Sequence, residues 1–100
     1  MTGITNNFIE LKQNEEIDRI IHESVLEFKQ VIGKEEKRKA CCRYFKRGIQ
    51  AGLSQEELID FLGMSDPSIL FLSGYTEEEE LEIMELIGEI SDSEIANISI

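Results

Sequence analysis

Apolar residues recur at intervals of three and four along most of this chain, which is the spacing of a helix with one buried face. Asn14 is a suitable N-cap and Gly33 a suitable C-terminal stop, so we expect a helix between them. The preceding residues, 1–12, are interrupted by Gly3 and two asparagines and are predicted to form an irregular arm. The apolar positions of the expected helix are Ile17, Ile20, Ile21, Val25, Phe28 and Ile32.

A second helix is predicted over residues 34–50, where Cys41, Phe45 and Ile49 recur every fourth residue. Its other faces carry a cluster of cations. Such a cluster can contact phosphate, but more often it is solvated or pairs with the acids of a neighbouring helix. The candidate contacts to phosphate or to an acidic partner are Lys39, Arg43, Lys46 and Arg47.

A third helix is predicted over residues 54–62, because Ser54 and Glu57 have the spacing of a capping box. Residues 64–66 should form a turn. Pro67 suits the first turn of the next helix, since it lacks an N–H that would go unpaired there. We therefore expect a short apolar helix from Pro67 to about residue 72.

The clearest prediction is a helix over residues 76–90. It opens with a capping box formed by Thr76 and Glu79, within a run of four glutamates. Its apolar side chains cover more than half of its circumference, so burial on two sides is required and a second chain is expected to supply part of it. Residues 92–100 are interpreted as a flexible tail or a short capped turn. The apolar positions of the helix are Leu81, Ile83, Met84, Leu86, Ile87 and Ile90.

These elements predict an all-α protein. One hundred residues suffice for a single domain, 1–100, with one modest core. We expect a compact orthogonal bundle of four to five helices. No apolar run approaches the ~20 residues needed to cross a bilayer, and residues 1–12 lack the basic start and apolar stretch of a secretory signal. A cytoplasmic protein that does not contact membranes is expected.

Candidate chemistry is sparse. Cys41 and Cys42 are adjacent and point about 100° apart on a helix, so they are poorly placed to bridge each other. No second ligand pair has zinc-site spacing, and the only histidine, His22, lies in another segment. Glu79 and Glu82 are a carboxylate pair on an exposed helix, where nothing raises the pKa of either carboxyl group. We therefore do not expect them to act as a general acid and base. We therefore expect no metal, no cofactor and no enzymatic activity.

Charge divides the chain into two parts. All ten Lys and Arg residues lie at or before Arg47, whereas the remaining 53 residues carry thirteen carboxylates and no basic side chain. An acidic surface repels phosphate and attracts cationic protein, over a range of ~8–10 Å at physiological salt. Nucleic acid is therefore not expected as a partner, and only the first part of the chain could contact it.

Residues 53–73 read LSQEELIDFLGMSDPSILFLS and resemble the helix-turn-helix of bacterial DNA-binding regulators over about a fifth of the chain. Leu58 and Leu62 stand where that family buries its first helix, and Gly63 stands where the family turns. Ile69 stands where it anchors the recognition helix, and Met64 and Ser65 stand where it plugs and caps the turn. The resemblance implies two short helices that cross steeply, with a positive φ at Gly63.

Two departures weaken the DNA-binding implication of this resemblance. Ile59 replaces the small residue that the family places where its helices approach most closely. The segment that would read bases lacks Arg, Lys, Asn and Gln, which are the usual donors and acceptors for base edges and phosphates. It offers Asp66, Ser68, Leu70 and Phe71 instead.

The leading hypothesis is a small non-enzymatic regulatory or adaptor protein that acts by protein–protein contact through its acidic, apolar C-terminal half. Its partner should present a basic or mixed apolar surface, and a homodimer through Ile83, Met84, Ile87 and Ile90 is expected. The alternative is a dimeric helix-turn-helix DNA-binding transcriptional regulator that uses the basic helix 34–47. A third is a homo-oligomeric structural module. The candidate partner-binding residues are Leu70, Phe71, Glu77, Glu80, Ile83, Met84, Ile87 and Ile90.

Overall fold

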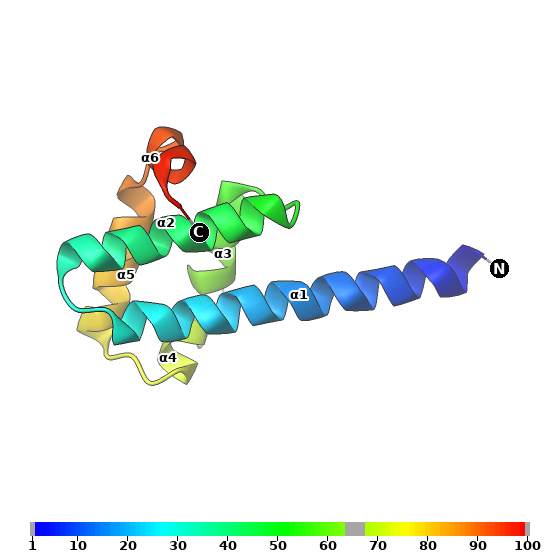
Figure 1. The fold of residues 1–100 in the computed structure, drawn as a ribbon. Coiled ribbons are helices and arrows are strands. Elements are labelled where there is room, and N and C mark those ends of the chain that lie inside the picture. Colours follow the sequence, from blue (N-terminus) through cyan, green and yellow to red (C-terminus); the bar gives the residue numbers. More distant parts are fainter. Residues whose placement is uncertain (1, 64–67, 100) are drawn as a thin grey trace.

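Helices form the regular structure of the computed structural model, which describes the backbone of residues 2–63 and 68–99 and the side chains from residue 15 onwards in these ranges. The all-α prediction is therefore confirmed for the described residues. They form a bundle of six helices, more than the four or five expected, because the end of the chain adds a short sixth helix (Figure 1). The helices are α1 (Thr2–Gln30), α2 (Lys34–Gln50), α3 (Gln55–Gly63), α4 (Ile69–Leu72), α5 (Glu77–Glu89) and α6 (Asp92–Asn97).

Helices α1 and α2 form an antiparallel pair, and α3 and α5 cross this pair at a steep angle (Figure 1). The chain reverses at Gly33, whose φ of 95° is a conformation that favours glycine. Phe28 of α1 packs edge to face on Tyr44 of α2, with the ring centroids 5.9 Å apart. These buried rings place the centre of the core between the pair and the crossing helices.

Two tyrosines connect the core to the crossing segments. The hydroxyl of Tyr44 donates to the carbonyl of Leu58 on α3 at 2.5 Å. The hydroxyl of Tyr75, just before α5, donates to the carbonyl of Val25 on α1. A buried hydroxyl without a partner is costly, so each bond fixes a crossing segment at one position on the α1–α2 pair.

The irregular arm expected over residues 1–12 is wrong, because α1 begins at Thr2 and not after Asn14. Glycine and asparagine in a helix each cost roughly 0.5–1 kcal/mol relative to alanine, which weakens a helix without stopping it. Ile4, Phe8 and Leu11 keep helical spacing across this segment. The first helix is therefore about twelve residues longer at its N-terminus than the predicted one.

The short helix α4 begins later than expected. It starts at Ile69, and the hydroxyl of Ser68 caps it by accepting from the backbone N–H of Phe71 at 3.2 Å. The predictions made for Met64, Ser65, Asp66 and Pro67 lie outside the described residues.

Of the two alternatives for the end of the chain, the short capped turn is confirmed by α6, and the flexible tail is wrong for these residues. Ser91 caps this helix by accepting from the N–H of Glu94, and Ile95 is buried. The residue pairs in contact place α6 against α2. The end of the chain therefore folds back onto the basic helix, as far as the structure describes it.

The α3 helix contains part of the helix-turn-helix-like segment, whose resemblance to that family stays a prediction. Leu58 and Leu62 are fully buried. Gly63 is the last residue of α3, and it is not among the described glycines that have a positive φ. A Cβ at this position would lie 2.8 Å from Met84 Cε. The small residue is therefore explained by a close approach of α5 and not by a left-handed turn.

Candidate protein-interaction surface

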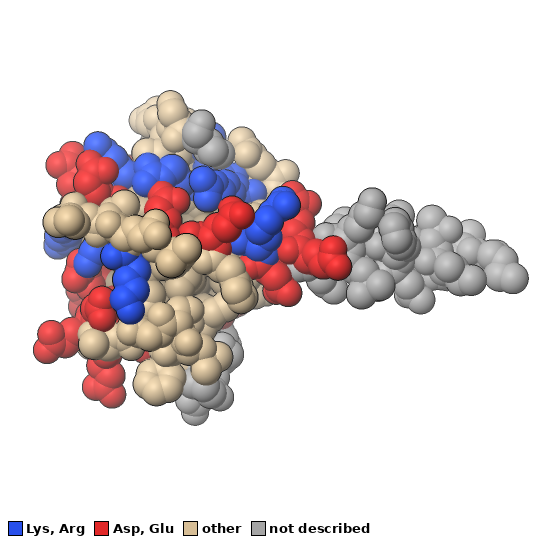
Figure 2. All heavy atoms as spheres, turned by 60° about the horizontal axis from the view of Figure 1, so that its bottom comes forward, with Lys and Arg blue, Asp and Glu red and all other residues tan. Residues whose placement is uncertain are grey.

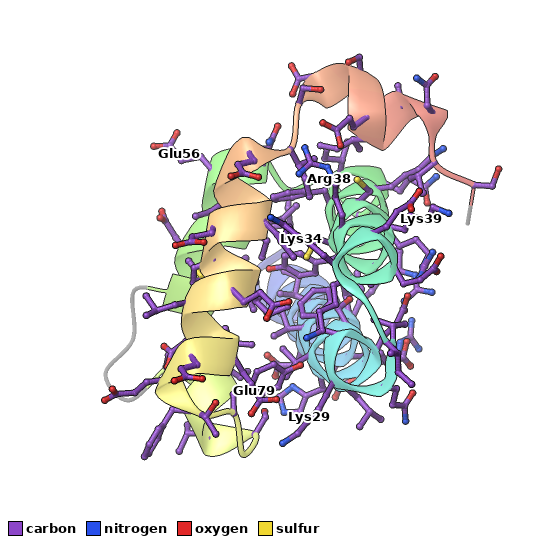
Figure 3. All side chains as sticks on the ribbon, turned by 90° about the vertical axis from the view of Figure 1, so that its left-hand side faces the viewer. Lys29, Lys34, Arg38, Lys39, Glu56 and Glu79 are labelled. Atoms are coloured by element: carbon purple, nitrogen blue, oxygen red, sulfur yellow. The ribbon has the colours of Figure 1, made fainter. Side chains whose placement is uncertain are left out.

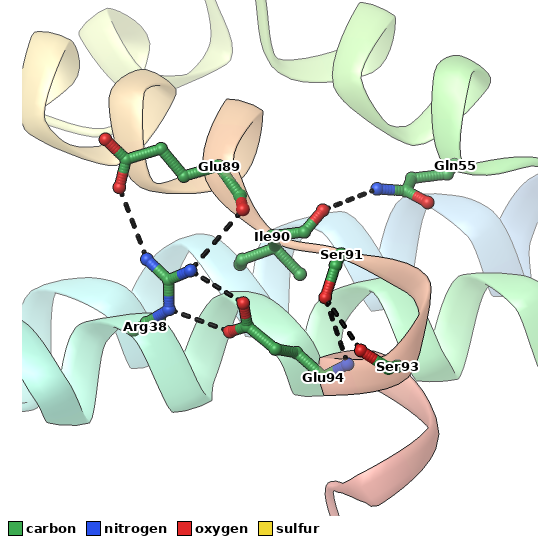
Figure 4. Close-up of polar contacts among 7 residues, drawn as sticks. All are labelled: Arg38, Gln55, Glu89, Ile90, Ser91, Ser93 and Glu94. Atoms are coloured by element: carbon green, nitrogen blue, oxygen red, sulfur yellow. Dashed lines mark hydrogen bonds and ion pairs between the residues drawn. The ribbon is translucent and has the colours of Figure 1, made fainter.

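Arg38 is the centre of a polar cluster that joins α2 to α5 and α6 (Figure 4). Its Nε and Nη2 donate to the two carboxylate oxygens of Glu94 at 2.8 and 2.7 Å, and its Nη1 lies 3.3 Å from Glu89 Oε2. These hydrogen bonds from Arg38 hold the pKa of Glu94 below its ordinary value. Hydrogen bonds to Glu89 and Glu94 of the same chain thus occupy the guanidinium, and a phosphate would have to displace them.

The four cations that were candidate phosphate contacts also have partners within the fold. Arg43 Nε donates to Glu27 Oε1 at 2.5 Å, and Arg47 lies 3.8 Å from the other oxygen of that carboxylate. Lys46 donates to the carbonyl of Ile98, and Lys39 lies 3.5 Å from Glu36. Pairing with an acid of a neighbouring helix is therefore confirmed for Arg43 and Arg47, whereas Lys46 is bound to a backbone carbonyl and Lys39 lies near an acid of its own helix.

Another cation of α2, Lys37, also pairs with an acid of a neighbouring helix. Lys37 lies 3.2 Å from Glu82 of α5. Lys and Arg are consequently interleaved with Asp and Glu on the face seen in Figure 2, instead of forming an uninterrupted basic patch. Lys34 and Arg38 lie along the side of α2 that faces α5 (Figure 3). The basic helix therefore serves mainly to hold α1, α5 and α6.

The interface expected on α5 is wrong. Ile83, Ile87 and Ile90 are buried within the chain, and Met84 is half-buried. Helices α2 and α3 pack on α5 and help to bury Ile83, Leu86 and Ile87, whereas Leu81 stays 62% exposed. These isoleucines are therefore core residues and are not accessible to a partner.

In the short helix α4, Leu70 points into the core and its neighbour Phe71 is exposed to solvent. Leu70 is fully buried, so its placement in a partner-binding surface is wrong, whereas Phe71 is 58% exposed and Leu72 is 70% exposed. Ser68 donates to Glu80 Oε1 at 2.6 Å, which fixes the start of α4 on α5. Glu80 thus has a hydrogen-bond partner within the fold. Of the two partner-binding candidates on α4, Leu70 and Phe71, only Phe71 is exposed.

The start of α5 places carboxylates a few residues after this exposed pair. The N–H of Glu79 donates to Thr76 Oγ1 at 3.2 Å, and the N–H of Thr76 donates to Glu79 Oε1 at 3.0 Å. These bonds lower the pKa of Glu79. Glu77 and Glu78 are exposed and make no ion pair with the described residues. We call Phe71, Leu72, Glu77 and Glu78 the α4 surface.

A groove beside α4 was missed by the sequence analysis. It has a volume of about 210 Å³ and lies between α1 and the segment that joins α4 to α5. Lys29 lines the groove, and its Nζ donates to the carbonyl of Gly74 at 2.8 Å. The signal for the groove was an apolar residue, Leu26, about 100° from Val25 and outside the buried stripe. The lining residues are His22, Val25, Leu26, Lys29, Ser73 and Tyr75.

The described residues offer little reactive chemistry. No group of three His, Cys, Asp or Glu within them could hold a metal ion. Burial raises the pKa of Cys41 to about 12, so this thiol stays protonated and is a poor nucleophile. None of the described helices is long and apolar enough to cross a membrane.

Searches against protein-family models, curated proteins and solved structures give no match.

Proposed function

We propose that the protein is a small non-enzymatic regulatory or adaptor protein that acts by protein–protein contact through the α4 surface. The observation that carries this proposal is the exposure of Phe71 and Leu72 next to each other, while Leu70 anchors the same turn in the core. An aromatic and an aliphatic side chain on a fixed turn lose little conformational freedom when a partner covers them. Such residues are typical centres of protein interfaces.

The charges nearby indicate the chemistry of the partner. Glu77 and Glu78 are exposed, and no Lys or Arg follows Arg47 in the sequence. An interface here gains most from an apolar side chain flanked by Lys or Arg, since opposite charges at the rim steer association. A nucleic acid backbone would instead meet carboxylates and would release few counterions.

The test uses the full chain as bait in extracts of its native cells. Wild type is compared with the double variant Phe71→Ser, Leu72→Ser, and with Ile32→Ser as a matched control. Ile32 is 90% exposed and lies just beyond the end of α1. A partner retained by wild type and Ile32→Ser should be lost by the double variant.

The partner must then bind directly. Purified partner should bind wild type more weakly as salt is raised, because part of the attraction is electrostatic. Phe71→Ala should weaken binding by ~1–3 kcal/mol, the range of a moderate hot spot. Equal affinity of the purified partner for wild type and for the double variant would refute the proposal. Both variants should melt close to wild type, since the replaced side chains are largely exposed.

A further inference from the structure

Helix α6 lies along one side of the basic helix α2. Arg38, Cys42 and Lys46 are spaced by four residues, so they share this side of α2. At one end of the line Arg38 binds the carboxylate of Glu94 (Figure 4), and at the other end Lys46 donates to the carbonyl of Ile98. The segment from Glu94 to Ile98 therefore spans the line. We call Arg38, Cys42 and Lys46 the α2 seat.

The thiol of Cys42 lies in the middle of the seat, next to α6. Cys42 is 4% exposed, and it lines a pocket of about 280 Å³ together with Glu94, Asn97 and Ile98. Burial, followed by the charge of Glu94, raises the pKa of this thiol. The neighbouring Cys41 is fully buried in the core, about 100° away around the helix. The two thiols therefore report different events: Cys42 reports separation of α6 from α2, and Cys41 reports opening of the core.

The attachment of α6 depends on few groups. Ile95 is the one residue of α6 that is buried, and Ile98, just after the helix, is partly buried. The two side chains of the ion pair that joins α6 to α2 are 31% and 36% exposed, and pairs at such exposure contribute little to stability. Before α6, Ile90 is buried and its carbonyl accepts from Gln55 Nε2 at 3.2 Å. Local opening can therefore begin at Ser91 and leave α5 in place.

The contacts that α6 makes show which chemistry the seat recognises. Arg38 Nε and Nη2 donate to the two carboxylate oxygens of Glu94 at 2.8 and 2.7 Å, a two-point geometry that fixes the orientation of a carboxylate. The next residue in the sequence, Ile95, is 5% exposed. Lys46 binds a backbone carbonyl, which any peptide can offer. The seat therefore suits a segment in which a carboxylate is directly followed by an aliphatic side chain.

We propose that the α2 seat is a docking site for an acidic, apolar segment of a partner protein, and that α6 occupies this site within the same chain as a removable latch. While α6 is bound, the partner meets an open seat in only a fraction of the molecules. Its apparent affinity is reduced by that fraction. This inference goes beyond the proposed function and does not depend on it, because the seat lies on α2 and takes an acidic segment, whereas the α4 surface is expected to take a basic one.

Alkylation of the full chain by N-ethylmaleimide measures the opening of the latch, with fragment mass spectrometry to distinguish the adjacent thiols. In wild type, Cys42 should react faster than Cys41. Ile95→Ser should raise the rate at Cys42 at least about tenfold, because loss of a buried aliphatic side chain destabilises the closed state. The rate at Cys41 should not change. The matched control Ala96→Ser replaces the neighbouring exposed residue and should leave both rates unchanged.

Lys46→Met is a second variant that leaves every apolar contact of Ile95 in place. It removes the hydrogen bond to the carbonyl of Ile98. Loss of a nearby cation disfavours the reactive thiolate, so a faster reaction of Cys42 in this variant must come from opening. We expect the rate at Cys42 to rise and the rate at Cys41 to stay at its wild-type value.

A synthetic peptide of residues 90–100 is the probe for docking. It should bind the full-length Ile95→Ser chain and slow the alkylation of Cys42, whereas the same peptide carrying Ile95→Ser should not. The affinity of the peptide for the Ile95→Ser chain should exceed its affinity for wild type by the factor that separates the two alkylation rates at Cys42. Both measurements report the same open fraction when closing is fast compared with alkylation.

Three results would overturn the inference. The first is a rate at Cys42 that neither Ile95→Ser nor Lys46→Met raises above the wild-type rate. The second is an equal rise at Cys41 and Cys42 in both variants, which indicates opening of the whole core. The third is a peptide that leaves Cys42 unprotected in a variant with the circular dichroism of wild type. The double variant of the α4 surface should bind the peptide as wild type does, so this inference and the proposed function can fail separately.

Discussion

Gly48→Ala tests a close approach between α2 and α3 in the core. A Cβ at Gly48 would lie 2.5 Å from Leu58 Cδ1 and 2.9 Å from Leu58 Cγ, and it would also collide with Cδ2. Carbon atoms in contact are normally ~3.5–4.0 Å apart. Leu58 is fully buried, so its whole branch has to move against its neighbours.

The expected magnitude is a balance of two effects. Overpacking in a well-filled core costs roughly 1–3 kcal/mol, while alanine is favoured over glycine in a helix by about 1 kcal/mol. The net result should be a loss of up to about 2 kcal/mol in the free energy of unfolding. Gly88→Ala is the matched control, because nothing lies within 4 Å of a Cβ added at that position of α5. It should stabilise the protein by up to about 1 kcal/mol.

Thermal and urea unfolding followed by circular dichroism measure both effects. A change of 1 kcal/mol moves the melting temperature of a domain of this size by roughly 4–8 °C, so the two glycine variants should move it in opposite directions. Leu58→Ala should cost about 2–5 kcal/mol in wild type and less in the Gly48→Ala background, where its removal makes room. A stabilised Gly48→Ala, or strictly additive losses in the double variant, would refute the proposed contact.

Three further predictions follow from the placement of α4, the basic helix and α6. Leu70→Ala should lower the free energy of unfolding by about 2–5 kcal/mol and Phe71→Ala by less than about 1 kcal/mol, and equal losses in urea unfolding would contradict their different burial. Duplex DNA titrated by fluorescence anisotropy at ~0.15 M salt should form no specific complex, and a nanomolar complex weakened by Arg43→Glu would defeat this prediction. The pKa of Glu94 is depressed in the fold, so its stabilising effect is complete above the ordinary value of 4.5 and is lost as pH falls through the folded pKa. The melting temperature of Glu94→Gln should therefore fall less on acidification than that of wild type. An equal fall would show that the Arg38–Glu94 pair does not cause the pH dependence of stability.

The boundaries of several helices could be predicted from sequence because their signals are local. Thr76 and Glu79 form the expected capping box, and α5 begins at the next residue. The start of α1 could not be predicted in this way. A glycine and two asparagines suggested an interruption, but their combined cost does not end a helix that is anchored further along the chain.

The candidate site could be predicted only in part, because spacing along a helix does not reveal which chain covers an apolar face. Ile83 and Ile87 had the pattern of an interface and proved to be core, since α2 and α3 enclose α5. Leu70 and Phe71 were both candidates for partner binding, and only Phe71 is exposed, because neighbours on a helix point about 100° apart. Leu26 was overlooked, because its significance depends on the distant segment that forms the other wall of the groove.

Some acids of the C-terminal half form ion pairs with cations of α2 within the fold. The acids that stay unpaired determine which kind of partner we expect. Glu82, Glu89 and Glu94 come from the acidic half of the chain and are paired with Lys37 and Arg38 of α2. Other acids of α3 and α5 make no ion pair with described residues. Glu77 and Glu78 are among these unpaired acids, and they follow the apolar pair of α4 by a few residues in the sequence. A partner that covers Phe71 must bring its own cations, which is why a basic protein surface fits this site and a phosphate backbone does not. Acids of α3 and α5 that form no ion pair with a described residue include Glu56, Glu57, Asp60, Glu77, Glu78 and Glu85.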